Sequence, residues 1–346
     1  MARPRGYSGY RGRGGKGKLV LAAFLVLVIL AAVVVMLLQR NIVYDAQGTP
    51  QLRLPWTDTT EEEATQEQET PDVDLIIQES EEPEPVLESH VIFQTEQMPL
   101  TLESWQAVLQ QIDQDAAVPY DAVAFTLKDS SGKVYFDALA MGVSAVNVEE
   151  DTMAALAEAT AGNLYTIARM SCFRDPKAAN ADVEGKGLKN TGGYIFYDGN
   201  NSQWLDPAKE AARTYLCGIA VEAAELGFDE ILLTDFSYPT EGKLDKIAYG
   251  DVVRSEQLLL FLQEVCAALE PYGVKISVEL SQEAVLSGGD EVAGVVVSEL
   301  AELVDRIYAP ATAAETEMMA AETGDALFVP ILTAYEDMPE HGGLIG

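Results

Sequence analysis

The sequence has few of the residues from which several common active sites are built. Its 346 residues include only two histidines and three cysteines. His90 and His341 are too few histidines to favour a histidine-based metal site or a Ser-His-Asp triad, and no Cys-x-x-Cys pattern occurs. The cysteines are odd in number, far apart and set in apolar segments, so we expect buried side chains rather than a disulfide framework. The sequence therefore predicts neither a metal nor a cofactor.

Basic residues are scarce beyond the first forty positions. The chain has 22 Lys and Arg against 56 Asp and Glu, a net charge of −34. Seven of the basic residues lie in residues 1–40, which contain no acid, so residues 41–346 hold 15 basic and 56 acidic residues and carry −41. Such a body repels phosphate backbones, which excludes nucleic acid as its partner. With 48% hydrophobic residues, the chain still has ample material for a core.

One long apolar run separates the basic from the acidic part. Leu19–Leu38 contains 20 apolar residues in succession, and as a helix it would be about 30 Å long, the thickness of the hydrocarbon core of a bilayer. The six basic residues of residues 1–18 place that end in the cytoplasm. A cleaved signal peptide is the alternative, but its apolar core is shorter, about 7–15 residues, and the residues after Leu38 form a poor cleavage site. We therefore expect a basic cytoplasmic head (1–18), a single transmembrane helix (19–38) in the cell membrane, and an extracytoplasmic remainder.

Residues 39–89 are predicted to be an acidic, disordered stalk. Thr57–Ser89 contains thirteen acids and no base, interleaved with Thr, Gln and Pro. Charge repulsion and the lack of core residues favour an extended chain. The stalk would hold the following domain away from the membrane.

From residue 90 onward, short apolar runs alternate with amphipathic stretches. Runs that are apolar on both faces and separated by helices indicate a parallel sheet covered by helices. Seven such units in residues 90–346 favour an α/β fold of the (β/α)8 TIM type over an open sheet, and no Gly-x-Gly-x-x-Gly follows the first strands. No eighth strand is evident after Leu332, so the barrel is incomplete at its C-terminus, or residues 90–94 are not its first unit, or the natural chain ends early. The predicted strands are residues 90–94, 122–127, 164–173, 230–234, 274–278, 304–308 and 327–332.

Acidic residues follow several of the predicted strands, at the end of a barrel where active sites lie. Asp235 follows the fourth strand and Glu279 the fifth. Glycosidases use two carboxyl groups about 5–5.5 Å apart for retention or about 6.5–9.5 Å apart for inversion. We predict Asp235 as the nucleophile or stabilising carboxylate and Glu279 as the general acid/base. The alternative is that acids fall at strand ends by chance in so acidic a chain, or cap helices, as we expect of Asp206 before Pro207.

Further polar and aromatic residues near the strand ends are candidates for substrate binding. Lys128 and Arg169 lie within or just beyond strands, where an unpaired charge is unfavourable, so we expect both to pair with nearby acids. Asp129 is either a site residue or a turn residue. Trp204, in a long polar loop with other aromatics, either stacks on a sugar or packs that loop. The predicted substrate-binding residues are Lys128, Asp129, Arg169, Trp204, Tyr238 and Tyr308.

Two segments resemble a known family. They are Tyr165–Pro176 (YTIARMSCFRDP) and Trp204–Asp235, which ends in LGFDEILLTD. Both are similar to the glycoside-hydrolase domain of exported bacterial proteins, and the turn from Lys128 to Gly132 fits the second strand of that family. The resemblance covers about residues 122–310. It implies a TIM barrel of the α-amylase-like kind that hydrolyses glycosidic bonds.

Several positions depart from the pattern of that family. Thr126 stands where the family has an acid, the loop from Asp235 to Pro239 is one residue shorter and lacks an arginine, and Glu279 replaces an aspartate. The segments 309–312 and 329–331 differ as well. Two interpretations follow. One is a membrane-anchored glycoside hydrolase that acts on a polysaccharide or cell-envelope glycan by a two-carboxylate mechanism. The other is a catalytically impaired barrel that binds a glycan or a partner at the cell surface.

Overall fold

The computed structural model describes residues 42–44, 50–52, 88–138, 146–324, 326–335, 338–339 and 342–345. The chain divides into two units, Met1–Ser80 and Glu81–Gly346. In the first, the described backbone is an antiparallel pair of strands, β1 (Ile42–Tyr44) and β2 (Pro50–Leu52), within the segment predicted to be a disordered stalk. The predicted head, the predicted transmembrane helix and most of the stalk lie outside the described residues. None of the helices in the described ranges is long and apolar enough to cross a membrane.

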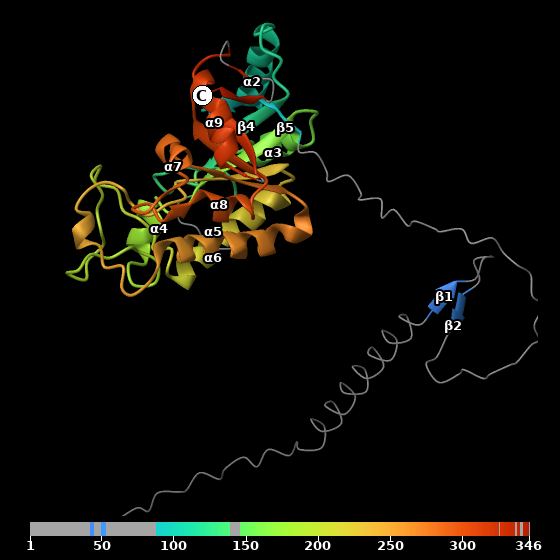
Figure 1. Cartoon of the computed structure of the whole chain (residues 1–346). Coiled ribbons are helices and arrows are strands. Elements are labelled where there is room, and N and C mark those ends of the chain that lie inside the picture. The colour runs from blue at the N-terminus through green and yellow to red at the C-terminus, as the bar shows by residue number, and fades with distance from the viewer. Residues whose placement is uncertain are drawn as a thin grey trace, which may run out of the picture. The chain divides into compact units, whose positions relative to one another are not determined.

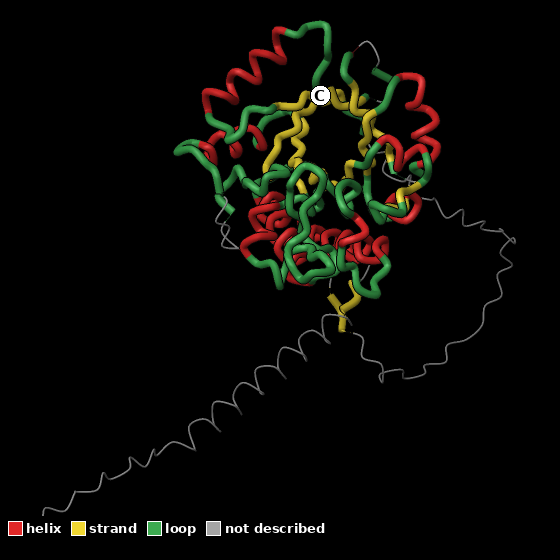
Figure 2. The backbone as a smooth tube through the Cα atoms, turned by 90° about the vertical axis from the view of Figure 1, so that its left-hand side faces the viewer, coloured by secondary structure: helices red, strands yellow, loops and turns green. Residues whose placement is uncertain are grey.

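The second unit is a closed barrel of eight parallel strands with helices on its outside, as predicted for a (β/α)8 TIM-type fold (Figure 1). Figure 2 shows the strands as a ring surrounded by the helices and loops. Each strand pairs with the next along the ring, and the last pairs with the first. In this order the strands are β3 (Val91–Thr95), β4 (Ala122–Lys128), β5 (Tyr165–Ser171), β6 (Glu230–Thr234), β7 (Lys275–Glu279), β10 (Arg306–Pro310), β11 (Leu327–Leu332) and β12 (Gly343–Ile345).

The eighth strand, β12, makes the barrel complete, which corrects the expectation of an incomplete C-terminus. Leu344 pairs with Ile92 of β3 on one side, and Ile331 of β11 pairs with Leu344 on the other. Gly342 directs the chain into this strand with a positive φ of 74°. A Cβ atom there would overlap the backbone of His90, so the turn into β12 requires glycine.

Helices follow most strands and bury one face against the barrel. The first, α2 (Leu102–Gln114), begins at a capping box between Thr101 and Ser104 and buries Trp105 and Val108. The others are α3 (Thr152–Thr160), α4 (Pro176–Ala181), α5 (Glu210–Glu225), α6 (Arg254–Leu269), α7 (Gln282–Leu286), α8 (Val297–Ala301) and α9 (Ala313–Glu322), with 3-10 turns at Leu244–Lys246 and Glu270–Tyr272. A short antiparallel hairpin, β8 (Gly289–Asp290) and β9 (Val295–Val296), lies between α7 and α8.

The strands are apolar on both faces because they pack on two different cores. Successive residues of β5 show this alternation, since Ile167 faces the barrel interior and Ala168 faces the helices. The interior also holds Leu232 of β6 and Tyr308 of β10. Burial on both sides explains why these strands read as continuous apolar runs.

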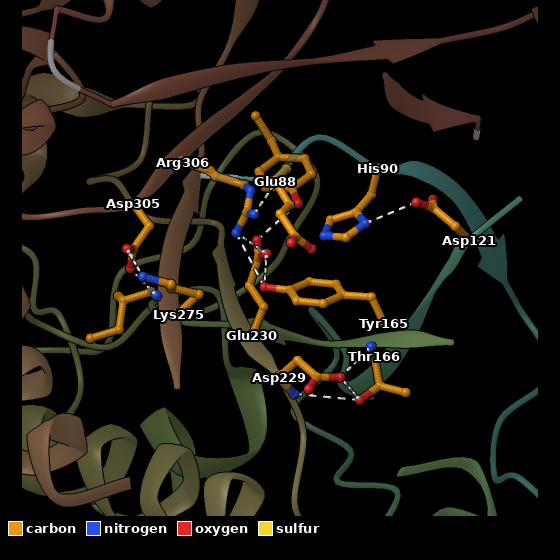
Figure 3. Close-up of polar contacts among 12 residues, drawn as sticks. Glu88, His90, Asp121, Tyr165, Thr166, Asp229, Glu230, Lys275, Asp305 and Arg306 are labelled. Atoms are coloured by element: carbon orange, nitrogen blue, oxygen red, sulfur yellow. Dashed lines mark hydrogen bonds and ion pairs between the residues drawn. The ribbon is translucent and has the colours of Figure 1, made fainter. Parts of the chain in front are cut away.

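The amino end of the barrel is filled by a buried polar cluster (Figure 3). Arg306 and Glu230, each the first residue of its strand, lie 2.8 Å apart between Nη1 and Oε2 with almost no exposure. The hydroxyl of Tyr165 donates to the same carboxylate at 3.1 Å, and His90 stacks on the Tyr165 ring. The buried charges of Arg306 and Glu230 are tolerated because they pair with each other and Glu230 also accepts from Tyr165 and Tyr308.

Candidate active site

Asp235 and Glu279 line one cavity of about 890 Å³ at the carboxyl end of the barrel. Glu279 is the last residue of β7, and Asp235 directly follows β6. The two strands are neighbours, with Leu233 opposite Val278, and neighbouring strands lie about 4.8 Å apart. The two carboxylates therefore rise from adjacent strand ends into the same space, as the sequence predicted.

The backbone at Asp235 adopts an unusual conformation. Its φ is +47°, in the left-handed region that few residues other than glycine enter. Aspartate tolerates this region better than most residues do. The Oγ atom of Ser171, at the end of β5, lies 2.6 Å from Oδ2 of Asp235. The sharp turn after β6 and this hydrogen bond together fix the carboxylate at the cavity wall.

Glu279 is held by Arg169. The Nη2 atom of Arg169 donates to Oε2 of Glu279 at 2.7 Å, and both side chains are mostly enclosed. Arg169 belongs to β5 and Glu279 to β7, so this ion pair spans the intervening strand β6 near the carboxyl end of the barrel. The expected pairing of Arg169 with an acid is confirmed. A charge-assisted bond of this length fixes the orientation of the carboxylate.

Lys128 also pairs with an acid, but it does not line the cavity. Its Nζ atom lies 3.0 Å from Oδ2 of Asp175, and neither side chain is exposed. The same Nζ donates to the backbone oxygen of Ser171 at 2.6 Å, and the hydroxyl of Tyr215 donates to Asp175 at 3.0 Å. Lys128 therefore holds the end of β5 in place, and its side chain is not exposed to a ligand.

Asp129 organises the turn after β4. Its Oδ1 accepts from the backbone and hydroxyl of Ser131 and from the backbone of Lys133, and Oδ2 accepts from the hydroxyl of Tyr135. Burial acts to raise the pKa of Asp129, but these hydrogen bonds outweigh it, and the pKa is lowered. This is the turn role that the sequence left open, and Asp129 does not line the cavity.

The three predicted aromatic residues are buried away from the cavity. Trp204 donates from Nε1 to Asp198 at 2.9 Å and packs the long loop after β5. Tyr238 is enclosed beside Tyr249. Tyr308 lies in the barrel interior, where its hydroxyl donates to Glu230 at 2.8 Å. Burial, and next the charge of Glu230, raise the pKa of Tyr308 well above its ordinary value, so the phenol remains a donor.

Four further acids line the cavity, and the sequence reasoning did not identify them. They come from the loop after β6, from the first turn of α7 and from the β8–β9 hairpin. A cluster of turn residues at 287–291 (SGGDE) is the one signal in the sequence that marks this hairpin. The four acids are Glu241, Glu283, Asp290 and Glu291.

The chain forms a closed (β/α)8 barrel with two acids from adjacent strand ends in one cavity, at the end of the barrel where active sites of this fold lie. Residues 95–311 match a family described as "Putative glycosyl hydrolase domain". The match spans well over half of the chain, and the chain belongs to this family. The resemblance seen in the sequence is thereby confirmed.

Solved structures similar to this chain were also found. One is a hypothetical protein from Ruminiclostridium thermocellum ATCC 27405, with 25% identity, 54% of this chain and 96% of that chain covered, and a TM-score of 0.44. Another is a variant of the glycoside hydrolase domain of PelA from Pseudomonas aeruginosa, with 17% identity, 70% of this chain and 83% of that chain covered, and a TM-score of 0.39. A third is the glycoside hydrolase domain of PgaB (BpsB) from Bordetella bronchiseptica, with 14% identity, 68% of this chain and 80% of that chain covered, and a TM-score of 0.48. No protein with a curated description matches the chain.

Proposed function

We propose that this chain hydrolyses a polysaccharide or cell-envelope glycan through Asp235 and Glu279. The observation that carries the proposal is that both carboxylates line one cavity at the carboxyl end of the barrel. Asp235 acts as the nucleophile or stabilising carboxylate, and the Ser171 hydroxyl beside it fixes its orientation. Glu279 acts as the general acid/base.

Arg169 bears on the role of Glu279. The guanidinium at 2.7 Å bonds Oε2 of Glu279 and fixes the direction of that side chain. Arg169 is therefore a positioning residue for the proposed general acid/base.

The same ion pair favours the second candidate function, a barrel that binds a glycan without cleaving it. In this geometry Oε2 of Glu279 bonds the guanidinium of Arg169, so that oxygen does not face a leaving group. The departures of the sequence from its family at Thr126 and in the loop after Asp235 point in the same direction.

Purified full-length chain assayed against a panel of glycans separates the two functions. We expect release of new reducing ends from at least one glycan. Asp235→Asn is expected to lower kcat by about 1,000-fold, within the range found for positioned catalytic groups. Asp245→Asn removes the same charge from an exposed loop residue paired with Lys246 and serves as the control. Activity that survives Asp235→Asn would show that the nucleophile is another residue, and binding without turnover would establish the second function.

We further propose that residues 19–38 anchor the chain in the cell membrane, with residues 1–18 in the cytoplasm and the barrel outside. The apolar run and the basic residues before it support this topology. In intact cells, added protease is expected to remove a tag at the C-terminus and to leave a tag at the N-terminus protected. A protected C-terminal tag in cells whose outer layers admit the protease would contradict the topology.

A further inference from the structure

The cavity that holds Asp235 and Glu279 is lined by acids alone among its charged residues. Its described lining includes six carboxylates and no lysine, arginine or histidine. A cleft lined by one sign of charge between low-dielectric walls focuses the electrostatic potential on whatever enters it. The six are Asp235, Glu241, Glu279, Glu283, Asp290 and Glu291.

Among the residues that the structure describes, a cation pairs with one of the six carboxylates, namely Arg169 with Glu279. Three others are held by neutral donors: Asp235 by a hydroxyl, Glu241 by an amide of Asn200, and Asp290 by backbone N–H groups. Within the described part of the chain, the side chains of Glu283 and Glu291 make no hydrogen bond or ion pair. The negative charge of the cavity is therefore largely uncompensated.

The acidic composition of the chain does not by itself explain this lining, because bases lie close by and are directed elsewhere. Lys243 and Lys246 belong to the same loop as Glu241, yet neither lines the cavity, and Lys246 pairs with Asp245 at 2.8 Å. Arg254 donates to the backbone oxygen of Val292 and lies over the Tyr249 ring. It lines a neighbouring cavity rather than this one.

The carboxylates come from separate segments of the chain, namely the loop after β6, the end of β7, α7 and the β8–β9 hairpin. In the residues that the structure describes, no group of three or more His, Cys, Asp or Glu is placed to hold a metal ion. A single compact cation therefore does not match the arrangement. A ligand with positive charges spaced along its length does, because each charge can meet a different carboxylate.

We propose that the substrate is a polysaccharide with free amino groups, that is, a polymer of amino sugars from which N-acetyl groups have been removed. This inference rests on the proposed function, since it names the substrate class of the same site. Each protonated amine would lie near a carboxylate of the lining. Anionic glycans, which carry carboxylate or phosphate, are repelled by the same cavity.

The inference is tested by binding to full-length Asp235→Asn protein, in which turnover is suppressed. The probes are oligomers of glucosamine and of galactosamine in several linkages, each paired with its N-acetylated counterpart of equal length, at a pH where the amines are protonated. We expect at least one free-amine oligomer to bind about tenfold more tightly than its acetylated partner, an order typical of a few charge pairs. Equal or weaker binding of every free-amine oligomer would overturn the inference.

A matched pair of variants locates the effect in the cavity. Glu283→Gln with Glu291→Gln, added to Asp235→Asn, is expected to weaken binding of the free-amine oligomer about fivefold, since each partly exposed pair contributes modestly. Glu299→Gln with Glu302→Gln removes the same charge at α8, outside the described cavities, and is expected to change binding less than about twofold. Equal weakening by both pairs would overturn the inference, because the attraction would then come from the net charge of the whole protein.

Failure of this inference is distinguishable from failure of the proposed function. Hydrolysis by the native protein of a neutral glycan only would leave the function standing and overturn the substrate class. Charge-dependent binding without hydrolysis of any probe would support the substrate class and overturn the hydrolase.

Discussion

The fully enclosed pair of Lys128 and Asp175 shows how single residues outside the cavity hold Ser171, which contacts Asp235, in place. The Nζ of Lys128 bonds both the carboxylate and the backbone of Ser171, whose side chain in turn contacts Asp235. Removing the cation leaves a buried carboxylate without its counter-ion, which typically costs about 3–5 kcal/mol.

We therefore predict that Lys128→Met lowers the free energy of unfolding by about 3–5 kcal/mol, as measured by urea denaturation. Lys133→Met, in the same turn but exposed, is expected to stay within about 0.5 kcal/mol of the native protein. A loss below about 1 kcal/mol for Lys128→Met would mean that the pair is not the support described.

Asp129 makes a prediction about pH. Its lowered pKa means that its contribution to stability is complete above the ordinary value of 3.8 and is lost as the pH falls through the lower value of the folded state. Asp129→Asn is expected to lose about 1–3 kcal/mol at neutral pH, because the hydroxyl of Tyr135 and the other donors lose their ionised acceptor. The difference between variant and native protein should shrink below pH 3.8. A difference that stays constant down to acid unfolding would contradict this role.

The sequence predicted some of these residue roles and not others. That Lys128 would pair with an acid followed from the unfavourable energy of an unpaired charge, but its depth depends on packing that no local pattern encodes. The Asp-Pro signal at Asp206 was interpreted as a helix cap, and this was wrong, because α5 begins only at Glu210. Oδ1 of Asp206 instead accepts from the backbone N–H of Ala208, in the turn before α5. The same signal at Asp175–Pro176 does cap a helix, α4. The two sites share a dipeptide and differ in the tertiary contacts that follow.

At the scale of elements, the strands that were predicted are those that contain a continuous apolar run. The missed strand, β12, has three residues, and its position is set by pairing with β11 and β3 rather than by a pattern of its own. The β8–β9 hairpin has two residues in each strand and was missed for the same reason. Because that hairpin supplies Asp290 and Glu291, the acidic lining of the cavity was not predictable from strand ends alone.

The role of β12 is testable by substitution of Leu344, whose side chain is fully buried in the barrel interior. Leu344→Ala is expected to lower the free energy of unfolding by about 2–5 kcal/mol, as for other large-to-small changes in a core. Ile345→Ala, at the half-buried neighbouring position, is expected to have a clearly smaller effect. Equal effects of the two substitutions in denaturant titrations would show that β12 does not close the barrel in this register.

At the scale of the whole molecule, charge is divided between three places. The basic residues of the head precede the predicted membrane span, and many acids lie in the predicted stalk. Others surround the cavity at the carboxyl end of the barrel, opposite the buried cluster around Glu230 (Figure 3). The net charge of −34 therefore arises mostly from residues other than the two carboxylates to which we assign the chemistry.

The measurement that tests the central claim most directly is the dependence of hydrolysis on the leaving group in Asp235→Asn and Glu279→Gln. The probes are aryl glycosides of the sugar that the native protein cleaves, one with a dinitrophenyl group that departs without a proton and one with a poor leaving group. In the first chemical step, Glu279→Gln is expected to keep most of the rate on the dinitrophenyl glycoside and to lose about 100- to 10,000-fold on the other. Asp235→Asn is expected to lose the rate on both. Near-native hydrolysis by Asp235→Asn, or an equal loss on both glycosides in Glu279→Gln, would contradict the assignment of the two carboxylates.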